Sequence, residues 1–446
     1  MIETLNRYFG LKANNTNIRT EVIAGITTFV TAMYIIVVNP AIISATGLPF
    51  NAVLTATVVL SAFCTILMGV YANNPILVAP GMGLNAFFTF AVVIGMKVPV
   101  ETALDAVFWA GVFFFLLSIF NVRTLIVKSI PKQIRYAVAA GIGLFITLIG
   151  FADAKFIVSK GTPVLGMAQL DMIMLTFVIG LVITSILVAK NIKGSLIIGI
   201  IITTILAIPI GRFYGDASAI NMGVPTLVSW KGIFAAPDFS LIGKLDLVGS
   251  LKWAIFPVTF AILFTDMFDS LSTFVGVAEA ANLMDKDGEP RNIKQSLIVD
   301  AIATGLAGVL GTSSGTAYIE SAAGVQQGGR TGLTALVAGL LFIPFMFLSP
   351  LLSIVPMIAT APALILVGVF MLKPVLKINW VTMDDAIPAF LAMVLIPFTF
   401  SITQGIIWGF LSWTLIKIAM GKYKEISVPL SDIDILCSLL LLSMVS

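Results

Sequence analysis

The sequence predicts an all-α membrane protein whose fourteen membrane-spanning segments form two inverted repeats of seven spans. Three observations lead to this fold class. Of the 446 residues, 59% are hydrophobic and only 11% are charged, whereas a soluble globular chain carries about 25% charged residues. Apolar runs of about 20 residues, which is the length that crosses a bilayer, recur along the chain. Two interrupted apolar segments lie at matching places in its two halves.

The composition also excludes several classes of function. The chain has no histidine, so carboxylates are the groups suited to carry a proton, and histidine metal sites are absent. A net charge of +3 without a basic arm indicates no nucleic-acid partner. The two cysteines, Cys64 and Cys437, lie in apolar stretches without metal-ligand spacing. We therefore expect no cofactor and no metal site.

The apolar runs divide the chain into two halves. We predict a first repeat at 1–211, an external connecting loop at 212–250, a second repeat at 251–421 and a C-terminal tail at 422–446, whose apolar end is too short to cross the membrane. The spans are expected near residues 21–45, 51–71, 83–97, 103–122, 134–152, 171–190, 194–211, 251–279, 294–311, 321–329, 332–357, 361–373, 384–400 and 402–420.

The basic residues orient these spans. The short loops expected outside are poorer in Lys and Arg than those expected inside, which is the asymmetry that the positive-inside rule describes. With an even number of spans, both termini are then expected in the cytoplasm. The membrane that the chain spans is expected to be the cytoplasmic membrane. The loops and helix ends expected inside contain Arg123, Lys128, Lys132, Arg135, Lys190, Lys193, Lys286, Arg291, Lys294, Arg330, Lys373, Lys377, Lys417, Lys422 and Lys424.

Two segments contain residues that break a membrane helix. In APGMGLNAFF (79–88), Pro80 and Gly83 predict an extended piece over 76–80 and then a half-helix. The stretch 311–332 has the same order of small residues, a β-prone TAYIE, a short helix and a Gly-Gly stop. Interrupted segments at equivalent places in two inverted halves indicate a transporter's binding site at the membrane midplane. The alternative is that these glycines and prolines only permit kinks or close helix packing.

Two carboxylates lie in the middle of the predicted eighth span. Asp266 is at its centre and Asp269 lies one turn further on, although a charge at mid-bilayer costs at least ~2.5–3.5 kcal/mol. Thr259, Ser270 and Thr273 fall at helical spacing with them, which predicts one polar stripe facing inward. Two acids so close resist simultaneous ionisation, and this suits reversible protonation. In the alternative, TDMFD marks a loop and Asp266 caps a helix.

Glu320 and Asn85 occupy similar positions in the two broken segments. Glu320 separates the extended TAYI from the short helix SAAG, and Asn85 lies in the half-helix after the first break. We interpret them as a ligand acceptor opposite an amide that both donates and accepts. Among Phe87, Phe88 and Phe90, we choose Phe87 to stack on a flat ligand. In the alternatives, Glu320 is only an acid that stabilises a helix dipole, Asn85 makes an inter-helix hydrogen bond, and the phenylalanines simply pack.

Three long motifs resemble one family. NPILVAPGMGLNAFF, TDMFDSLSTFVGVAEAANLMDKDG and YIESAAGVQQGGRTGLT are similar to the nucleobase–cation symporter 2 superfamily, and most to its AzgA-like guanine/hypoxanthine permeases. The similarity runs from residue 19 to about residue 421. It implies fourteen spans in two inverted repeats, with a core domain of spans 1–4 and 8–11 and a gate domain of spans 5–7 and 12–14. It also implies a short β-stretch at the start of spans 3 and 10.

The resemblance further implies proton-coupled uptake of purine bases by alternating access. Adenine-preferring relatives tend to lack APGMGLNAFF, so we expect guanine and hypoxanthine as substrates. The positions that match the family's third-span asparagine, eighth-span carboxylates and tenth-span glutamate are Asn85, Asp266, Asp269 and Glu320. We expect the base to be bound by Asn85, Asp266, Glu320 and Phe87. We expect the proton to be coupled through Asp266, Asp269 and Glu320.

This sequence departs from the family pattern at Ser272, where the family commonly has a glycine, and the hydroxymethyl group would narrow the site or add a hydroxyl. Four alternatives stay open. The chain would be an adenine or broader purine permease, a Na⁺-coupled symporter, an anion transporter of the same fold, or a membrane enzyme, for which no nucleophile–base pair is present. The expected partners are a purine base, H⁺, the lipid bilayer and, as one arrangement, a second copy in a homodimer, with no nucleic acid.

Overall fold

The computed structural model describes residues 2–120, 130–159, 165–218, 224–247, 249, 252, 255–284 and 289–445. Nine helical stretches within these residues are long and apolar enough to cross a membrane. The helices are α1 (Ile2–Tyr8), α2 (Ile18–Ala32), α3 (Ile35–Ile43), α4 (Phe50–Val70), α5 (Met82–Ala86), the π-helix η2 (Phe87–Gly95), α6 (Val100–Ile119), α8 (Lys132–Asp153), α9 (Met172–Ala189), α10 (Ser195–Ala207), α11 (Phe256–Ala281), α12 (Ile293–Leu310), α13 (Ser321–Gln326), α14 (Gly332–Phe342), α15 (Ser349–Leu352), α16 (Met357–Met371), α17 (Met383–Thr399), α18 (Ile402–Ala419) and α19 (Val428–Val445).

Helices occur at the places where the apolar runs predict spans, with two differences. The first span is interrupted by a turn at Met33 and Tyr34, between α2 and α3. The span expected over 332–357 ends its α-helix at residue 342 and continues as short 3₁₀ and α turns. Pro344 and Pro350 explain the second difference, because proline lacks the amide hydrogen that a continuous helix needs.

Fourteen spans, the repeat boundaries and the orientation in the membrane stay predictions. Among the basic residues that support the orientation, Arg123, Lys128 and Lys286 lie outside the described residues. A short antiparallel pair of strands, β2 (Ile157–Ser159) and β3 (Leu165–Met167), lies between α8 and α9, where the sequence predicts only a loop.

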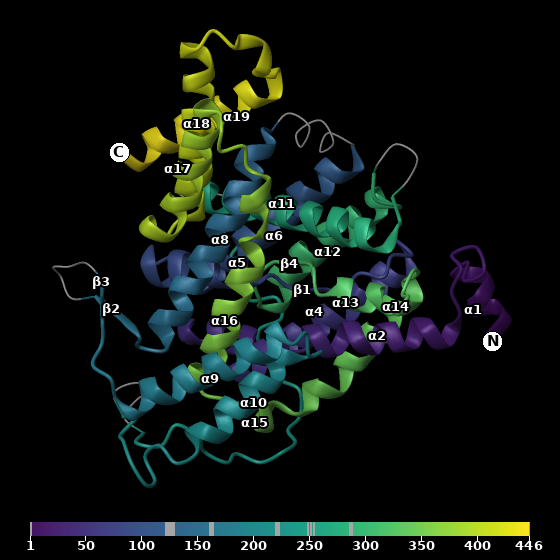
Figure 1. Ribbon diagram of the computed structural model, residues 1–446, viewed down its shortest axis with the longest axis vertical. Coiled ribbons are helices and arrows are strands. Elements are labelled where there is room, and N and C mark those ends of the chain that lie inside the picture. Colours follow the sequence, from purple (N-terminus) through teal and green to yellow (C-terminus); the bar gives the residue numbers. More distant parts are fainter. Residues whose placement is uncertain are drawn as a thin grey trace.

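The two predicted breaks meet at the centre of the molecule (Figure 1). Each contains a short strand, β1 (Val78–Pro80) and β4 (Gly315–Ala317), and the two strands pair in antiparallel register. Beyond the ladder, the backbone N–H of Tyr318 donates to the carbonyl of Leu77 at 2.9 Å. Backbone groups that leave a helix inside a membrane must find partners in the protein. Each break supplies the partners that the other break needs.

The helices pack in two groups. The core group is α2, α4, α6, α12, α13 and α14, and the gate group is α8, α9, α10, α16, α17 and α18. These groups contain helices that the resemblance assigns to the core and to the gate. Helix α11 contacts both groups, and α5 contacts α8 of the gate group. At Gly83 of α5, an added Cβ would lie 2.3 Å from Cγ2 of Ile142 in α8, so the glycine permits α5 to lie close against α8 beside the first break.

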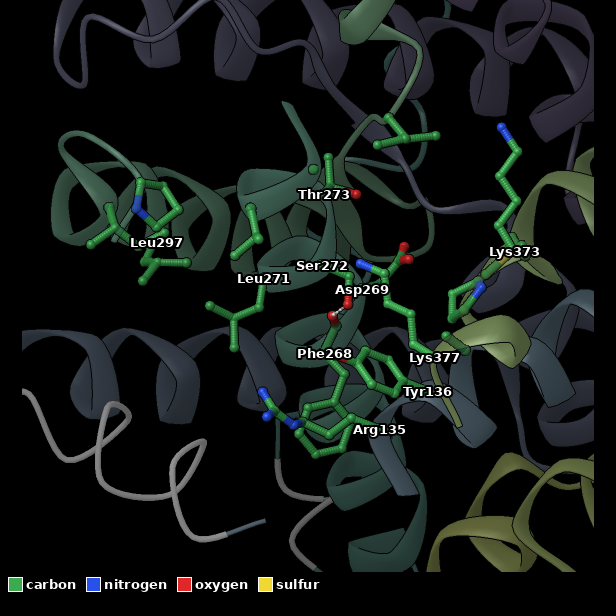
Figure 2. Close-up of a pocket in the computed structure, with 18 of the residues that line it drawn as sticks. Arg135, Tyr136, Phe268, Asp269, Leu271, Ser272, Thr273, Leu297, Lys373 and Lys377 are labelled. Atoms are coloured by element: carbon green, nitrogen blue, oxygen red, sulfur yellow. Dashed lines mark hydrogen bonds between the residues drawn. The ribbon is translucent and has the colours of Figure 1, made fainter. Parts of the chain in front are cut away.

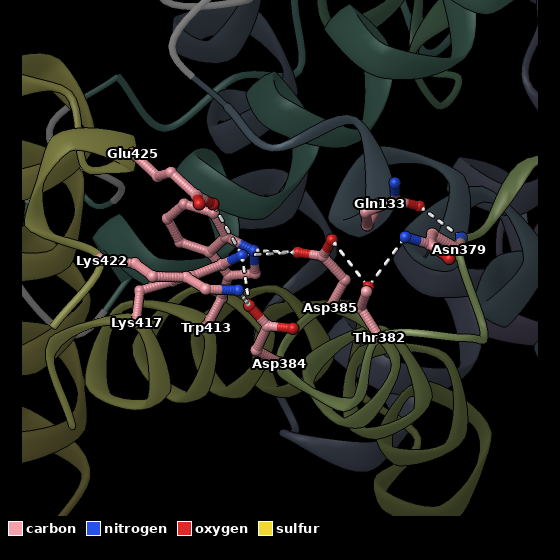
Figure 3. Close-up of polar contacts among 9 residues, drawn as sticks. All are labelled: Gln133, Asn379, Thr382, Asp384, Asp385, Trp413, Lys417, Lys422 and Glu425. Carbon is pink, nitrogen blue, oxygen red and sulfur yellow. Dashed lines mark hydrogen bonds and ion pairs between the residues drawn. The ribbon is translucent and has the colours of Figure 1, made fainter. Parts of the chain in front are cut away.

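A cluster of charged residues joins α17, α18 and the C-terminal tail (Figure 3). Lys417 is only 2% exposed, and its Nζ lies 2.8 Å from Oδ2 of Asp384, 3.2 Å from Oδ1 of Asp385 and 2.7 Å from Oε2 of Glu425. Trp413 donates its indole N–H to Asp385 at 3.0 Å. An ammonium group that is removed from water needs such compensation. The tail continues from this cluster into α19, which packs on α18.

Replacing Lys417 with methionine is expected to lower the unfolding temperature of the purified protein, because three carboxylates lose a shared buried cation. Lys422→Met is the matched control. Lys422 also lies 2.5 Å from Oδ2 of Asp384, but its side chain is 38% exposed, so water can replace it. Thermal unfolding in detergent measures both variants, and equal losses would mean that the burial of Lys417 is not what stabilises the cluster.

Candidate functional site

A cavity of about 910 Å³ is lined by residues of α8, α11, α12 and α16 and by the turn before α13 (Figure 2). Its volume lies within the range of small-molecule pockets, roughly 300–1,000 Å³. Two of its acids are Asp269, from the middle of α11, and Glu320, from the turn before α13. Basic residues line it at the first turns of α8 and α12 and just after α16: Arg135, Lys294, Lys373 and Lys377.

Glu320 is held by a residue that the sequence analysis does not identify. The hydroxyl of Tyr34 donates to Oε1 of Glu320 at 2.7 Å. Tyr34 is 1% exposed and lies in the turn between α2 and α3. The interruption of the first span therefore positions a donor beside the second break. The only signal in the sequence is one phenol in the aliphatic run MYIIVV.

Asp266 and Asp269 have different surroundings although they are three residues apart. Asp266 is fully buried, and its Oδ2 accepts hydrogen bonds from the hydroxyls of Thr304 and Ser314, the latter at 3.0 Å. These contacts tie α11 to α12 and to the segment before β4. Asp269 lines the cavity instead. Of the two acids in the expected polar stripe, Asp269 thus lines the cavity and Asp266 does not. The roles predicted for Asp266 in substrate binding and proton coupling stay predictions.

Asn85 and Phe87 are not among the residues that line this cavity. Asn85 is fully buried and accepts a hydrogen bond from the hydroxyl of Ser313, just before β4. Phe87 is 1% exposed and packs in the hydrophobic core. The contacts thus match the two alternatives considered above, a hydrogen bond between the breaks and simple packing. Contact of Asn85 or Phe87 with a substrate stays a prediction.

Three aromatic residues outside the predicted set line the cavity, namely Tyr136, Phe268 and Phe370. Aromatic residues in apolar helices usually pack in the core, so spacing alone does not identify them. Ser272 also lines the cavity, and its hydroxyl donates to the carbonyl of Phe268 at 2.8 Å (Figure 2). The departure from glycine therefore narrows the cavity, while the hydroxyl hydrogen stays within the helix.

Comparisons with known proteins indicate that the chain is a transporter. The model of the Permease family matches residues 19–407. An adenine permease of Escherichia coli (strain K12) is 41% identical over 95% of this chain and 92% of its own length. A guanine/hypoxanthine permease of Bacillus subtilis (strain 168) is 41% identical over 94% of this chain and 96% of its own length.

Among solved structures, the transmembrane domain of the cyanobacterium bicarbonate transporter BicA is similar. Its TM-score is 0.62 at 16% sequence identity, over 88% of this chain and 97% of that chain. At such low identity the likeness shows the fold alone. The match to the permease model and the relatives at 41% identity also identify the family. The chain belongs to this permease family, the nucleobase–cation symporter 2 family, and is a multi-span membrane transporter and not an enzyme.

Proposed function

We propose that the chain takes up purine nucleobases, guanine and hypoxanthine in particular, together with protons across the cytoplasmic membrane. The observation that carries the proposal is that Asp269 of α11 and Glu320 of the second broken segment line one cavity. Relatives at 41% identity are an adenine permease and a guanine/hypoxanthine permease, which supports purines as the substrate class.

The hydrogen-bonding edges of the bases favour guanine and hypoxanthine over adenine. Guanine presents N1–H beside its 2-amino group, two donors that one carboxylate can accept together. Hypoxanthine keeps the N1–H donor. Adenine presents an acceptor at N1, which would face the lone pairs of Glu320. A site built for a donor rejects an analogue that lacks it, because buried polar groups are then unpaired.

Proton coupling follows in this proposal from two acids that share one cavity. Protonating one of Asp269 and Glu320 removes a negative charge from a site that must close around its ligand. The loaded site, which carries one negative charge fewer, can then move with the core group past the gate group, whereas the empty site with both carboxylates ionised moves less readily. The basic residues that line the cavity are those expected in the cytoplasm, so in this proposal the cavity opens toward the cytoplasm.

Uptake of labelled hypoxanthine by cells that lack their own purine permeases tests the proposal. We expect saturable uptake that a protonophore abolishes and that guanine inhibits more strongly than adenine, xanthine or uracil. Stronger inhibition by adenine would contradict the substrate assignment. Uptake that follows Na⁺ and ignores the protonophore would contradict the coupling ion. Absence of uptake of any base, with the protein present in the membrane, would contradict the function.

Replacing Tyr34 with phenylalanine is expected to raise the apparent KM for hypoxanthine about tenfold. The variant loses the hydroxyl that positions Oε1 of Glu320, and a hydrogen bond to a charged group contributes about 1.5–3 kcal/mol. Tyr8→Phe is the matched control, since the exposed Tyr8 donates its hydroxyl to the carbonyl of Val70 and does not line the cavity. An unchanged KM in Tyr34→Phe would show that the Tyr34 hydroxyl does not contribute to substrate binding.

A further inference from the structure

We propose that the mouth of the cavity is a second subsite, for the phosphate of a purine nucleoside 5′-monophosphate, which binds from the cytoplasm and inhibits transport. The base end of this ligand rests on the proposed function, whereas the phosphate end rests on the residues at the mouth alone. The ligand is a nucleotide and not the transported base, so this subsite adds regulation to the transport site.

The mouth has an excess of positive charge among the residues that the structure describes. Arg135, Lys294, Lys373 and Lys377 line it, with Glu289 as an acidic neighbour. Within the described residues no ion pair involves any of these four cations. Nε of Arg135 is buried and has no hydrogen-bond partner in that part of the chain. Buried donors without partners favour an anionic ligand that would satisfy them.

The positive-inside rule explains basic residues on the cytoplasmic surface, but it does not require them to line a cavity. Two of these lysines are held at the cavity wall by aromatic rings. Nζ of Lys377 lies 5.9 Å from the ring centroid of Tyr136, and Nζ of Lys373 lies 6.0 Å from that of Phe370. These distances are at the outer limit of cation–π attraction. Figure 2 shows both lysines beside the same cavity as Asp269.

The polarity of the cavity matches a molecule with a base at one end and a phosphate at the other. Acceptors for the N–H groups of a base lie at Asp269 and Glu320, and the cations lie at the mouth. Along α11 the lining extends from Phe268 to Gly276, which is ~12 Å at 1.5 Å per residue. A free base fills only part of about 910 Å³, and a nucleoside monophosphate spans this depth.

Such a ligand would inhibit the transporter and would not be carried by it. A phosphate held by Lys373 and Lys377 keeps its charge at the mouth, and a doubly charged group opposes movement of the core group through the membrane. Transfer of a ribosyl phosphate from an activated donor to a ring nitrogen of the imported base, with loss of the donor's leaving group, would produce this ligand.

The experiment measures thermal unfolding of the purified full chain in detergent with guanosine 5′-monophosphate, guanosine, guanine and inorganic phosphate. We expect the monophosphate to stabilise the protein at lower concentration than guanosine or phosphate, and guanine to compete with it. In the double variant Lys373→Gln/Lys377→Gln its apparent Kd should rise about tenfold or more, since charge-assisted hydrogen bonds are lost. The matched control is Lys132→Gln, an exposed lysine outside the cavity lining, with unchanged Kd.

Several outcomes would overturn the proposal. The monophosphate binding no better than guanosine or phosphate would exclude a joint base and phosphate site. An equal loss of affinity in Lys132→Gln would assign the effect to diffuse surface charge. Displacement of the nucleotide by anionic phospholipid in mixed micelles, without competition by guanine, would make the mouth a lipid headgroup site. Unfolding temperatures without ligand report whether each variant folds.

The phosphate subsite and the proposed function can fail separately. In inside-out membrane vesicles, base transport that persists unchanged in the presence of the monophosphate overturns the subsite and leaves purine transport standing. Conversely, a nucleotide that binds through Lys373 and Lys377, in a protein that transports no base, supports the subsite and overturns the proposed transport of purines.

Discussion

Glu320→Gln is expected to abolish saturable hypoxanthine uptake while the protein remains in the membrane at its usual amount. Glutamine keeps the size of the side chain, and its amide oxygen can still accept from Tyr34. The variant loses the negative charge and the second acceptor for the N–H groups of a purine. The hydrogen bonds from N1–H of hypoxanthine and from Tyr34 then go to a neutral group. At about 1.5–3 kcal/mol for each bond to a charged group, the loss amounts to about a hundredfold or more in kcat/KM.

Glu279→Gln provides the control for this variant. Glu279 lies exposed near the C-terminal end of α11 and is not among the residues that line the cavity. Its uptake kinetics should equal those of the unmodified protein, and antibody detection in membranes gives the amount of each variant. Normal uptake by Glu320→Gln would exclude Glu320 from both substrate binding and proton coupling.

Asp269→Asn is expected to uncouple transport of the base from the proton gradient. In proteoliposomes the variant should still exchange labelled for unlabelled hypoxanthine, but an imposed pH gradient should no longer drive accumulation. Asparagine resembles the protonated carboxyl in size and charge, so the loaded conformation forms, while the proton that couples the cycle has lost its carrier. Asp269 has this role in the proposal because it lines the cavity, whereas hydroxyl donors hold Asp266.

Asp266→Asn should behave differently. Its amide group would present a donor where the hydroxyls of Thr304 and Ser314 now donate, so the contact between α11 and the second break weakens. We expect less folded protein in the membrane, measured by size-exclusion chromatography of detergent extracts. A well-folded Asp266→Asn protein that exchanges without accumulating, beside an Asp269→Asn protein that is normal, would reverse the two assignments.

The interruptions of the two broken segments can be predicted from local sequence, whereas the pairing between them cannot. Proline and glycine disfavour a continuous helix, so Pro80 and Gly83 are enough to predict an interruption before the half-helix α5. The pairing of β1 with β4 is a tertiary contact between distant segments. No pattern within either segment specifies that partner. The turn at Tyr34 is missed for a related reason, because MYIIVV contains neither glycine nor proline.

The site shows the same limit. Asp269 and Glu320 are evident in the sequence because a carboxylate in an apolar run requires a reason. Helical spacing puts Asp266 and Asp269 near one face. Only the packing of α12 and of the segment before β4 decides that hydroxyl groups donate to Asp266 while Asp269 lines the cavity. The aromatic lining cannot be predicted in this way, since phenylalanine in a membrane helix usually only packs.

The central claim is that protons drive purine transport through the cavity that Asp269 and Glu320 line. Purified protein in proteoliposomes, with labelled hypoxanthine outside and an imposed pH gradient, acid outside, tests it most directly. We predict accumulation of the base above its external concentration, collapse of that accumulation when a protonophore removes the gradient, and inhibition by guanine. Entry that is the same with and without the gradient, or no entry of the base beside transport of an inorganic anion, would contradict the claim.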